Sequence, residues 1–198
     1  MVAPPTWFGT MTSKTELRSI LRKRRAEFRA NVPAPMPWRT ELVAAIANVD
    51  YVGSYSAMGG EPDLSMINCS IAETGKQLAL PRVEGRGTAM TFHRWSIEEA
   101  LERAAFGFAQ PPISATMVEP QLLLVPMVGF DRALRRLGQG AGHYDRYFER
   151  FPGAIRIGIA WSVQEVEMIA TDSWDVPMHA ILTEKEWICA TTIGKVTS

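Results

Sequence analysis

Tyr51–Leu80, YVGSYSAMGGEPDLSMINCSIAETGKQLAL, is the stretch that decides the fold. Its first part, Tyr51–Ala57, predicts a buried strand, and Gln77–Leu80 predicts a second one. The intervening segment predicts a helix that ends at Gly75 and carries apolar residues at helical spacing, namely Leu64, Ile67 and Ile71. Parallel strands need a crossover of about this length, and such crossovers are nearly always right-handed, so this βαβ unit predicts a mostly parallel sheet.

The segments on either side extend this α/β pattern. The capping box Ser13–Glu16 predicts the start of an amphipathic helix with a basic face, which the three prolines of Asn31–Pro37 end. A shorter helix follows around Leu42, and Phe106–Glu119 is expected to be an ordered loop. Further strands are expected at Ala89–Arg94, Leu122–Val125, Ile155–Trp161 and Ala180–Thr183, with helices at Ile97–Arg103 and Tyr144–Phe151.

The length of 198 residues suits one domain with one core. We expect a three-layer α/β/α domain over residues 13–198, with a mostly parallel, Rossmann-like sheet. Residues 1–12 contain Pro, Gly and a second methionine, Met11, directly before the first helix, and are expected to form a flexible extension. The sequence leaves open whether Met1 or Met11 is the native start.

The charge and cysteine content limit the classes of partner. Lys+Arg and Asp+Glu each number 21, so no global field gathers nucleic acid or anionic lipid. Cys69 and Cys189 are far apart, which argues against a disulfide framework or a zinc site. No run of 18 apolar residues and no signal-peptide pattern occurs. We therefore expect a cytoplasmic protein with neither nucleic acid nor membrane as a partner. We also expect a monomer that acts on small molecules, although nothing in the sequence fixes the oligomeric state.

A glycine-rich loop, Gly138–Gly142, is the main candidate for chemistry. It comes after the apolar strand Leu122–Val125 and just before a predicted helix. Glycines at alternate positions allow the backbone to present successive N–H groups to phosphate oxygens, and a helix N-terminus adds partial positive charge. Arg136 is a possible bidentate phosphate clamp, and Asp145 offers hard carboxylate oxygens to Mg²⁺.

The glycine spacing alone is weak evidence, because a tight turn explains it as well as a phosphate cradle does. No Gly-Lys-Ser/Thr follows, and GxGxG is not the GxGxxG fingerprint of dinucleotide-binding proteins. The flanking residues Arg136, Tyr144, Asp145 and Arg146 favour the functional interpretation, since a turn requires none of them.

With its preceding strand, the loop VPMVGFDRALRRLGQGAGHYDRYFER (Val125–Arg150) resembles the signature of the 5-formyltetrahydrofolate cyclo-ligase family, which runs Pro, an apolar pair, Phe-Asp, then Arg-Leu-Gly-x-Gly-x-Gly-x-Tyr-Asp-Arg. Lys14–Arg18 is similar to the family's Lys-x-x-Leu-Arg. Ser56–Asp63 is similar to the strand and loop that carry a substrate-binding glutamate. The resemblance extends from about residue 13 to residue 187.

The resemblance implies an enzyme that cyclises 5-formyltetrahydrofolate to 5,10-methenyltetrahydrofolate, with ATP as co-substrate, Mg²⁺ as cofactor, and phosphorylation of the formyl oxygen. It assigns ATP binding to Lys14, Arg18, Arg136, Leu137, Gly138, Gln139, Gly140, Ala141, Gly142, His143 and Tyr144. It assigns folate binding to Ser56, Glu61, Gln139, Gly140, Ala141, Gly142 and His143. Asp145 is the implied Mg²⁺ ligand, and Arg136 and Tyr144 are the implied catalytic residues.

Two other functions remain as alternatives. One is a homologue with the same fold that binds folate or nucleotide but has an altered activity. The other, a nucleic-acid-binding module using Arg22–Arg25 and Arg132–Arg146, is disfavoured because the net charge is zero and no aromatic residues alternate with those arginines in a known motif.

Two further features bear on the site: the histidine at position 179 and a group of aromatic residues. By the same resemblance, His179 stands where relatives often have an acidic residue associated with the metal. Two alternatives follow: Asp172 or Asp175 provides the second carboxylate, or Mg²⁺ is completed by water and ATP oxygens. Four aromatic residues have faces that could stack on a pterin, but buried aromatics more often belong to a core, so we leave them out of the site. These are Trp38, Trp95, Phe106 and Phe108.

Overall fold

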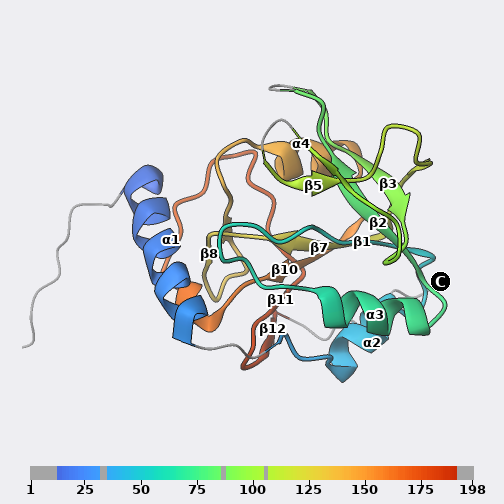
Figure 1. Cartoon of the computed structure of the whole chain (residues 1–198). Coiled ribbons are helices and arrows are strands. Elements are labelled where there is room, and N and C mark those ends of the chain that lie inside the picture. The colour runs from blue at the N-terminus through green and yellow to red at the C-terminus, as the bar shows by residue number, and fades with distance from the viewer. Residues whose placement is uncertain (1–12, 32–34, 86–87, 105–106, 191–198) are drawn as a thin grey trace, which may run out of the picture.

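The computed structural model describes residues 13–31, 35–85, 88–104 and 107–190, and it has an eight-stranded central sheet with helices on both faces (Figure 1). The strand order is β12-β11-β10-β7-β1-β2-β3-β6. These strands are β1 Tyr51–Gly53, β2 Gln77–Arg82, β3 Thr91–Trp95, β6 Met117–Val118, β7 Leu122–Pro126, β10 Ile155–Ile159, β11 Ala180–Leu182 and β12 Trp187–Cys189. The five inner strands from β11 to β2 are parallel, and β12, β3 and β6 are antiparallel to their neighbours.

Two short hairpins and five helical segments complete the described chain. The hairpins are β4 Glu102–Arg103 with β5 Ala109–Gln110, and β8 Gly129–Phe130 with β9 Arg136–Leu137. The helices are α1 Lys14–Asn31, α2 Thr40–Ile46, α3 Ser65–Glu73, α4 His143–Arg150 and the short 3₁₀ helix η1 Ser162–Gln164. Within the described ranges, none of these helices is both long and apolar enough to cross a membrane.

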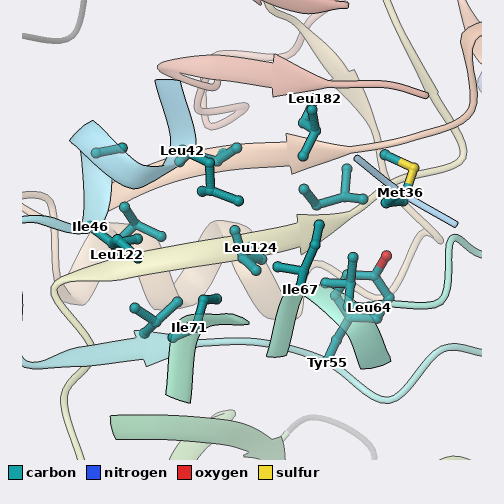
Figure 2. Packing of buried hydrophobic residues seen from close by; sticks show 14 of the residues in the cluster. Met36, Leu42, Ile46, Tyr55, Leu64, Ile67, Ile71, Leu122, Leu124 and Leu182 are labelled. Atoms are coloured by element: carbon teal, nitrogen blue, oxygen red, sulfur yellow. The ribbon is translucent and has the colours of Figure 1, made fainter. Parts of the chain in front are cut away.

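Successive side chains of the buried strands point to alternate faces of the sheet, and the helices that cover these two faces form the outer layers. In β7, Leu122 and Leu124 face α2 and α3, whereas Leu123 and Val125 face the side covered by α4. Figure 2 shows Leu122 and Leu124 packed among side chains of α2 and α3, such as Leu42 and Ile71. Successive side chains of a strand point to opposite faces, so a strand that is apolar throughout must be covered on both. The predicted three-layer arrangement with a mostly parallel sheet is confirmed.

The predicted βαβ unit is confirmed, but its first strand is shorter than expected. Strand β1 ends at Gly53 rather than at Ala57 and pairs in parallel with β2. The Ser54 N–H still donates to the Ala79 carbonyl of β2 at 2.8 Å, but beyond it the chain leaves the ladder. The hydroxyl of Tyr55 donates a hydrogen bond to the carbonyl of Pro62 at 2.8 Å. Tyr55 and Ser56, which were expected to continue the strand, line a cavity instead.

The prediction of a helix at Ile97–Arg103 is wrong. The backbone turns at Ser96–Glu99, where the Glu99 N–H donates to the Ser96 carbonyl, and Glu102–Arg103 then pairs with β5. The Glu99 carboxylate also accepts from the Ser96 N–H, and these local bonds replace those of a helix. The expected loop over Phe106–Glu119 contains the short strands β5 and β6, and Phe106 itself lies outside the described residues.

Helix α1 lies beside the sheet rather than on either of its faces (Figure 1). Its capping box is confirmed, with Ser13 Oγ accepting from the Glu16 N–H and Glu16 Oε2 accepting from the Ser13 N–H. Leu21 packs against the β8–β9 hairpin, where Gly129 permits the close approach because a Cβ there would overlap the leucine side chain. This contact holds α1 next to the hairpin that leads into the glycine loop. The predicted extension at residues 1–12 lies outside the described residues.

Candidate active site

A cavity of about 380 Å³ opens beyond the carboxyl ends of β1, β2 and β7, between α1 and α4. Ligands of open parallel sheets characteristically bind at such strand ends. Every residue that the sequence assigned to the site lines this cavity: Lys14, Arg18, Ser56, Glu61 and all of Arg136–Asp145. The fold thus brings together side chains separated by more than a hundred positions along the chain.

The glycine loop joins β9 to α4 and has the backbone geometry that its sequence predicts. Gly140 and Gly142 have φ angles of +105° and +65°, which disfavour residues with a Cβ. Gly142 is the residue that precedes helix α4, so the loop leads directly into a helix N-terminus. From α1, Arg18 Nε donates a 2.8 Å hydrogen bond to the Gly138 carbonyl. A cation of the first helix therefore anchors the start of the loop.

Arg136 and Asp145 form an ion pair at the base of the loop. Arg136 is buried, its Nη2 donates to Asp145 Oδ1, and its Nη1 donates to the Val176 carbonyl at 2.6 Å. The guanidinium also lies 5.2 Å from the centre of the Phe148 ring. The positive charge of Arg136, the expected phosphate clamp, thus offsets the negative charge of Asp145, the expected metal ligand.

Lys14 is held by two carboxylates at the mouth of the cavity. Its Nζ lies 2.6 Å from Asp172 Oδ2 and 2.7 Å from Asp175 Oδ2. Partial burial disfavours the charge, but the hydrogen bonds to both aspartates outweigh it and raise the pKa of Lys14. Burial opposes ionisation of Asp175 as well, yet the bond from Lys14 lowers the pKa of that carboxyl. Lys14 and Asp175 are therefore both charged at neutral pH.

Glu61 is buried at the inner end of the cavity and follows two glycines in positive-φ conformations, Gly59 and Gly60. Its Oε2 accepts from the Met58 N–H at 3.1 Å, and its Oε1 accepts from the Gln139 amide at 3.0 Å. Burial raises the pKa of this carboxyl, although these hydrogen bonds and the nearby Arg25 act in the opposite direction. Ser56, which follows β1, lines the same wall.

Tyr144, in the first turn of α4, places an enclosed hydroxyl near Glu61. Among the residues that the structure describes, this hydroxyl has no hydrogen-bond partner. Burial, with a further contribution from the negative charge of Glu61, raises the pKa of the phenol well above its ordinary value. Tyr144 is therefore a neutral hydrogen-bond donor at physiological pH, and a buried donor without a partner calls for an explanation.

The two histidines behave differently. His143 lines the cavity, and burial together with the neighbouring Arg146 lowers its pKa, so it is neutral at physiological pH. His179 is exposed, does not line the cavity, and accepts a hydrogen bond at Nδ1 from the Arg156 N–H at 3.0 Å. The departure from the family pattern at His179 thus lies away from the cavity, whereas Asp172 and Asp175 line it.

Several lining residues were missed by the sequence interpretation. Phe108, which the sequence interpretation leaves out of the site, lines the cavity. Trp174 also lines it, with 67% of its surface exposed. An apolar face without charge or motif gives no signal in a single sequence, so such residues are found only once the chain is folded. The other missed members are Tyr55, Met58, Pro81, Val83, Met90 and Pro126.

The donor set is compatible with Mg²⁺, which prefers carboxylate oxygens and usually retains water and phosphate ligands. Asp145, Asp172 and Asp175 line the same cavity. Within the described ranges, no three His, Cys, Asp or Glu side chains are close enough together to hold a metal ion by themselves. Any Mg²⁺ here would therefore take part of its coordination from water or from a bound phosphate.

Comparison with known proteins identifies the family. The model of the 5-formyltetrahydrofolate cyclo-ligase family matches residues 10–184. The chain belongs to this family. A cyclo-ligase of Haemophilus influenzae is 33% identical over 99 residues, which cover 47% of this chain and 53% of that protein. A cyclo-ligase of Mycolicibacterium smegmatis is 30% identical over 148 residues, covering 70% of this chain and 76% of that protein.

Solved structures of cyclo-ligase relatives share the fold. The 5,10-methenyltetrahydrofolate synthetase of Aquifex aeolicus superposes with a TM-score of 0.68 at 28% identity, covering 92% of this chain and 97% of that one. A synthetase of Mycoplasma pneumoniae superposes with a TM-score of 0.64 at 20% identity, which supports the fold alone. The protein is thus a cyclo-ligase family member by sequence and by structure, and the expected ligase and folate-related class is confirmed.

Proposed function

We propose that the protein catalyses the ATP-dependent conversion of 5-formyltetrahydrofolate to 5,10-methenyltetrahydrofolate, with release of ADP and phosphate. One observation carries this proposal: a cationic group, Lys14, Arg18 and Arg136, lines the same cavity as a buried carboxylate, that of Glu61. The first group suits a polyphosphate and the second suits the N–H donors of a pterin. The family membership supports the same pairing of ligands.

The chemistry explains why ATP is required. The formyl carbon on N5 is amide-like, and its oxygen is a poor leaving group. Transfer of the γ-phosphoryl group of ATP to that oxygen forms an O–P bond and releases ADP. N10 then attacks the activated carbon, loses its proton, and expels the former formyl oxygen as part of phosphate. No covalent bond to the enzyme is needed, so the protein contributes alignment and charge stabilisation.

We assign the triphosphate to the open end of the cavity. There Gly138–Gly142, which lead into the N-terminus of α4, line the cavity together with Lys14 and Arg18. Lys14 is already held by Asp172 and Asp175, so a triphosphate must compete with these carboxylates for the ammonium group. Arg136 lies behind Asp145 and is placed to stabilise the transferring phosphoryl group. The remaining loop residues, Leu137, Gln139, Ala141 and His143, complete this wall.

We assign Mg²⁺ to Asp145, with Asp175 or Asp172 as a second carboxylate and with the remaining ligands supplied by ATP and water. When bound, the ion would neutralise phosphate charge. The pairing of Asp145 with Arg136 supports this assignment, because an arginine that donates to one carboxylate oxygen fixes the orientation of the carboxylate.

We assign the folate to the enclosed end. Glu61 offers a carboxylate to the pterin, and Ser56 lies on the same wall. Tyr144, a neutral donor without a protein partner, is placed to hydrogen-bond the formyl oxygen or the transferred phosphoryl group. The aromatic face of Phe108 offers apolar contact.

We further propose that residues 13–198 form one domain, which acts as a monomer in the cytoplasm. Both large hydrophobic clusters share the same central sheet, which supports a single folding unit. Both cysteines are free thiols, as expected in a reducing compartment.

The direct test is to incubate the purified protein with 5-formyltetrahydrofolate, ATP and Mg²⁺ and to follow the near-ultraviolet absorbance of the methenyl product. We expect an absorbance rise that requires ATP and is matched by equimolar ADP. With substrate labelled with ¹⁸O in the formyl group, the label should appear in phosphate. If no ATP-dependent rise occurs while both ligands still bind, the protein is instead a binding homologue with altered activity.

A further inference from the structure

Arg25 is an unusual residue of helix α1, because its charged side chain is only 3% exposed. The other basic residues of the same helix turns, Arg22, Lys23 and Arg24, are exposed. A buried guanidinium without good pairing is costly, so such a residue is expected to have a specific partner. Arg25 does not line the cavity itself, and the family resemblance assigns it no ligand.

The partner of Arg25 is the loop that carries Glu61. Nη2 donates a 2.8 Å hydrogen bond to the Gly59 carbonyl, and the guanidinium lies against Gly59 and Gly60. The Trp161 indole N–H donates to the Gly60 carbonyl at 3.0 Å from another side. The two glycines have positive φ angles and provide no side chain to hold themselves in place. Arg25 and Trp161 therefore fix the conformation that directs Glu61 into the cavity.

The contact between Arg25 and Glu61 is a charge interaction without a direct hydrogen bond. Nη1 lies 3.7 Å from Glu61 Oε1, beyond hydrogen-bonding distance. Nε and Nη1 have no hydrogen-bond partner within the described part of the chain. Met58 and Gln139 supply the two hydrogen bonds that the carboxylate does accept. Because each carboxylate oxygen can accept two bonds, Glu61 keeps acceptor sites free for a ligand while Arg25 stabilises its charge.

We propose that Arg25 is a positioning residue for folate binding, which fixes the Gly59–Glu61 loop and keeps the Glu61 carboxylate an anion directed at the cavity. This inference rests on the proposed function, in which Glu61 binds the folate. The remaining titratable or charged groups around the pair are Arg22, Tyr55, Asp63 and Tyr144. Burial raises the pKa of both tyrosines well above neutrality, so neither supplies a negative charge, and Arg25 is the buried cation beside Glu61.

The first test is Arg25→Met, with Arg29→Met as the control on the exposed side of the same helix. We expect the KM for 5-formyltetrahydrofolate to rise on the order of 10-fold or more, as for loss of a buried charge partner, while the KM for ATP changes by less than about 2-fold. Titration of the Glu61 carboxyl by ¹³C NMR should show a higher pKa in Arg25→Met than in the unmodified protein, because the Arg25 cation that lowers it is lost. Equal changes in both KM values, or an unmoved Glu61 titration, would overturn the proposal.

The second test uses Glu61→Gln and guards against misfolding of the single variant. If Arg25 acts through Glu61, the double variant Arg25→Met/Glu61→Gln should bind 5-formyltetrahydrofolate within about 2-fold of Glu61→Gln alone. A further loss of about 10-fold would show that Arg25 acts elsewhere and would overturn the proposal. The NMR titration needs no substrate, so a failed Arg25 inference is distinguishable from an absence of turnover in the unmodified protein.

Discussion

The two ends of the cavity use the same chemistry, cations paired with carboxylates, but differ in burial. At the open end, the side chains of Lys14, Asp172 and Asp175 are 27%, 47% and 21% exposed. At the enclosed end, those of Arg25 and Glu61 are 3% and 4% exposed. Partly hydrated pairs exchange partners at low cost, whereas separating a buried pair leaves an uncompensated charge. The open end thus suits a polyanion that must enter and leave, and the enclosed end suits recognition by fixed groups.

The largest expected effect comes from the pair at the base of the glycine loop, Arg136 and Asp145. We expect Arg136→Ala and Asp145→Ala each to lower turnover by a factor on the order of 10² or more, because lost phosphate and metal contacts typically cost this much. Steady-state rates of methenyl formation measure the effect. Glu149→Gln, on the exposed side of the same helix, is the control. Near-unchanged rates for either alanine variant would remove that residue from the catalytic role assigned to it.

Lys14→Met tests the open end more narrowly. Loss of one exchangeable cation should raise the KM for ATP on the order of 10-fold, the scale of a single charge-assisted hydrogen bond, with little change in the KM for folate. Because Lys14 is partly exposed, the KM for ATP should also rise with salt concentration in the unmodified protein and rise less steeply in the variant. A parallel rise in both KM values would show that the two ends are not independent.

The pH dependence should separate the two ends further. Burial raises the pKa of Glu61 above 4.5, so on lowering the pH this carboxyl gains a proton, and loses its charge, before an exposed glutamate does. The KM for folate should therefore rise as the pH is lowered toward 4.5. The pKa of Lys14 is raised above 10.5 by its aspartate partners, so its charge is constant from pH 7.5 to pH 9. This range lies above the phosphate pKa of about 6, so the KM for ATP should stay level across it. Measuring both KM values against pH tests this difference.

The smallest effect is expected where ion pairs are fully at the surface. Arg132 contacts Glu165 and Glu186 at 2.7 Å, and its side chain is 55% exposed. Exposed pairs of this kind contribute about 0–1 kcal/mol to stability. Arg132→Ala should therefore lower Tm only slightly and leave turnover unchanged, as thermal melts and the methenyl assay would measure. A large loss of turnover would mean that this surface network also supports the site.

The sequence predicted the fold and most of the cavity wall because both leave local patterns. The βαβ unit over Tyr51–Leu80 carries its own helical and strand periodicities, and Gly140 and Gly142 stand where positive φ angles are needed. The helix expected at Ile97–Arg103 failed because side-chain bonds and a tertiary strand pairing outweighed local propensity. Periodicity in a short window could not reveal either of these interactions.

Contacts between residues that are distant in the sequence could not be predicted from the sequence. Nothing in the sequence around Arg25 distinguishes it from Arg24, because burial depends on where α1 lies against Gly59 and Gly60. In the same way, the link of Lys14 to Asp172 and Asp175 joins positions about 160 residues apart. Phe108 could not be placed in the site from the sequence, because an aromatic side chain gives the same local signal at a cavity wall as in a packed interior.

The most direct test of the division between the two ends is a crossed binding measurement on Lys14→Met and Glu61→Gln. The dissociation constants of a non-hydrolysable ATP analogue and of 5-formyltetrahydrofolate would be measured separately for each variant by calorimetry. We predict that Lys14→Met weakens binding of the nucleotide and spares the folate, and that Glu61→Gln does the reverse. If each variant weakened both ligands equally, the assignment of ATP to the open end and folate to the enclosed end would be contradicted.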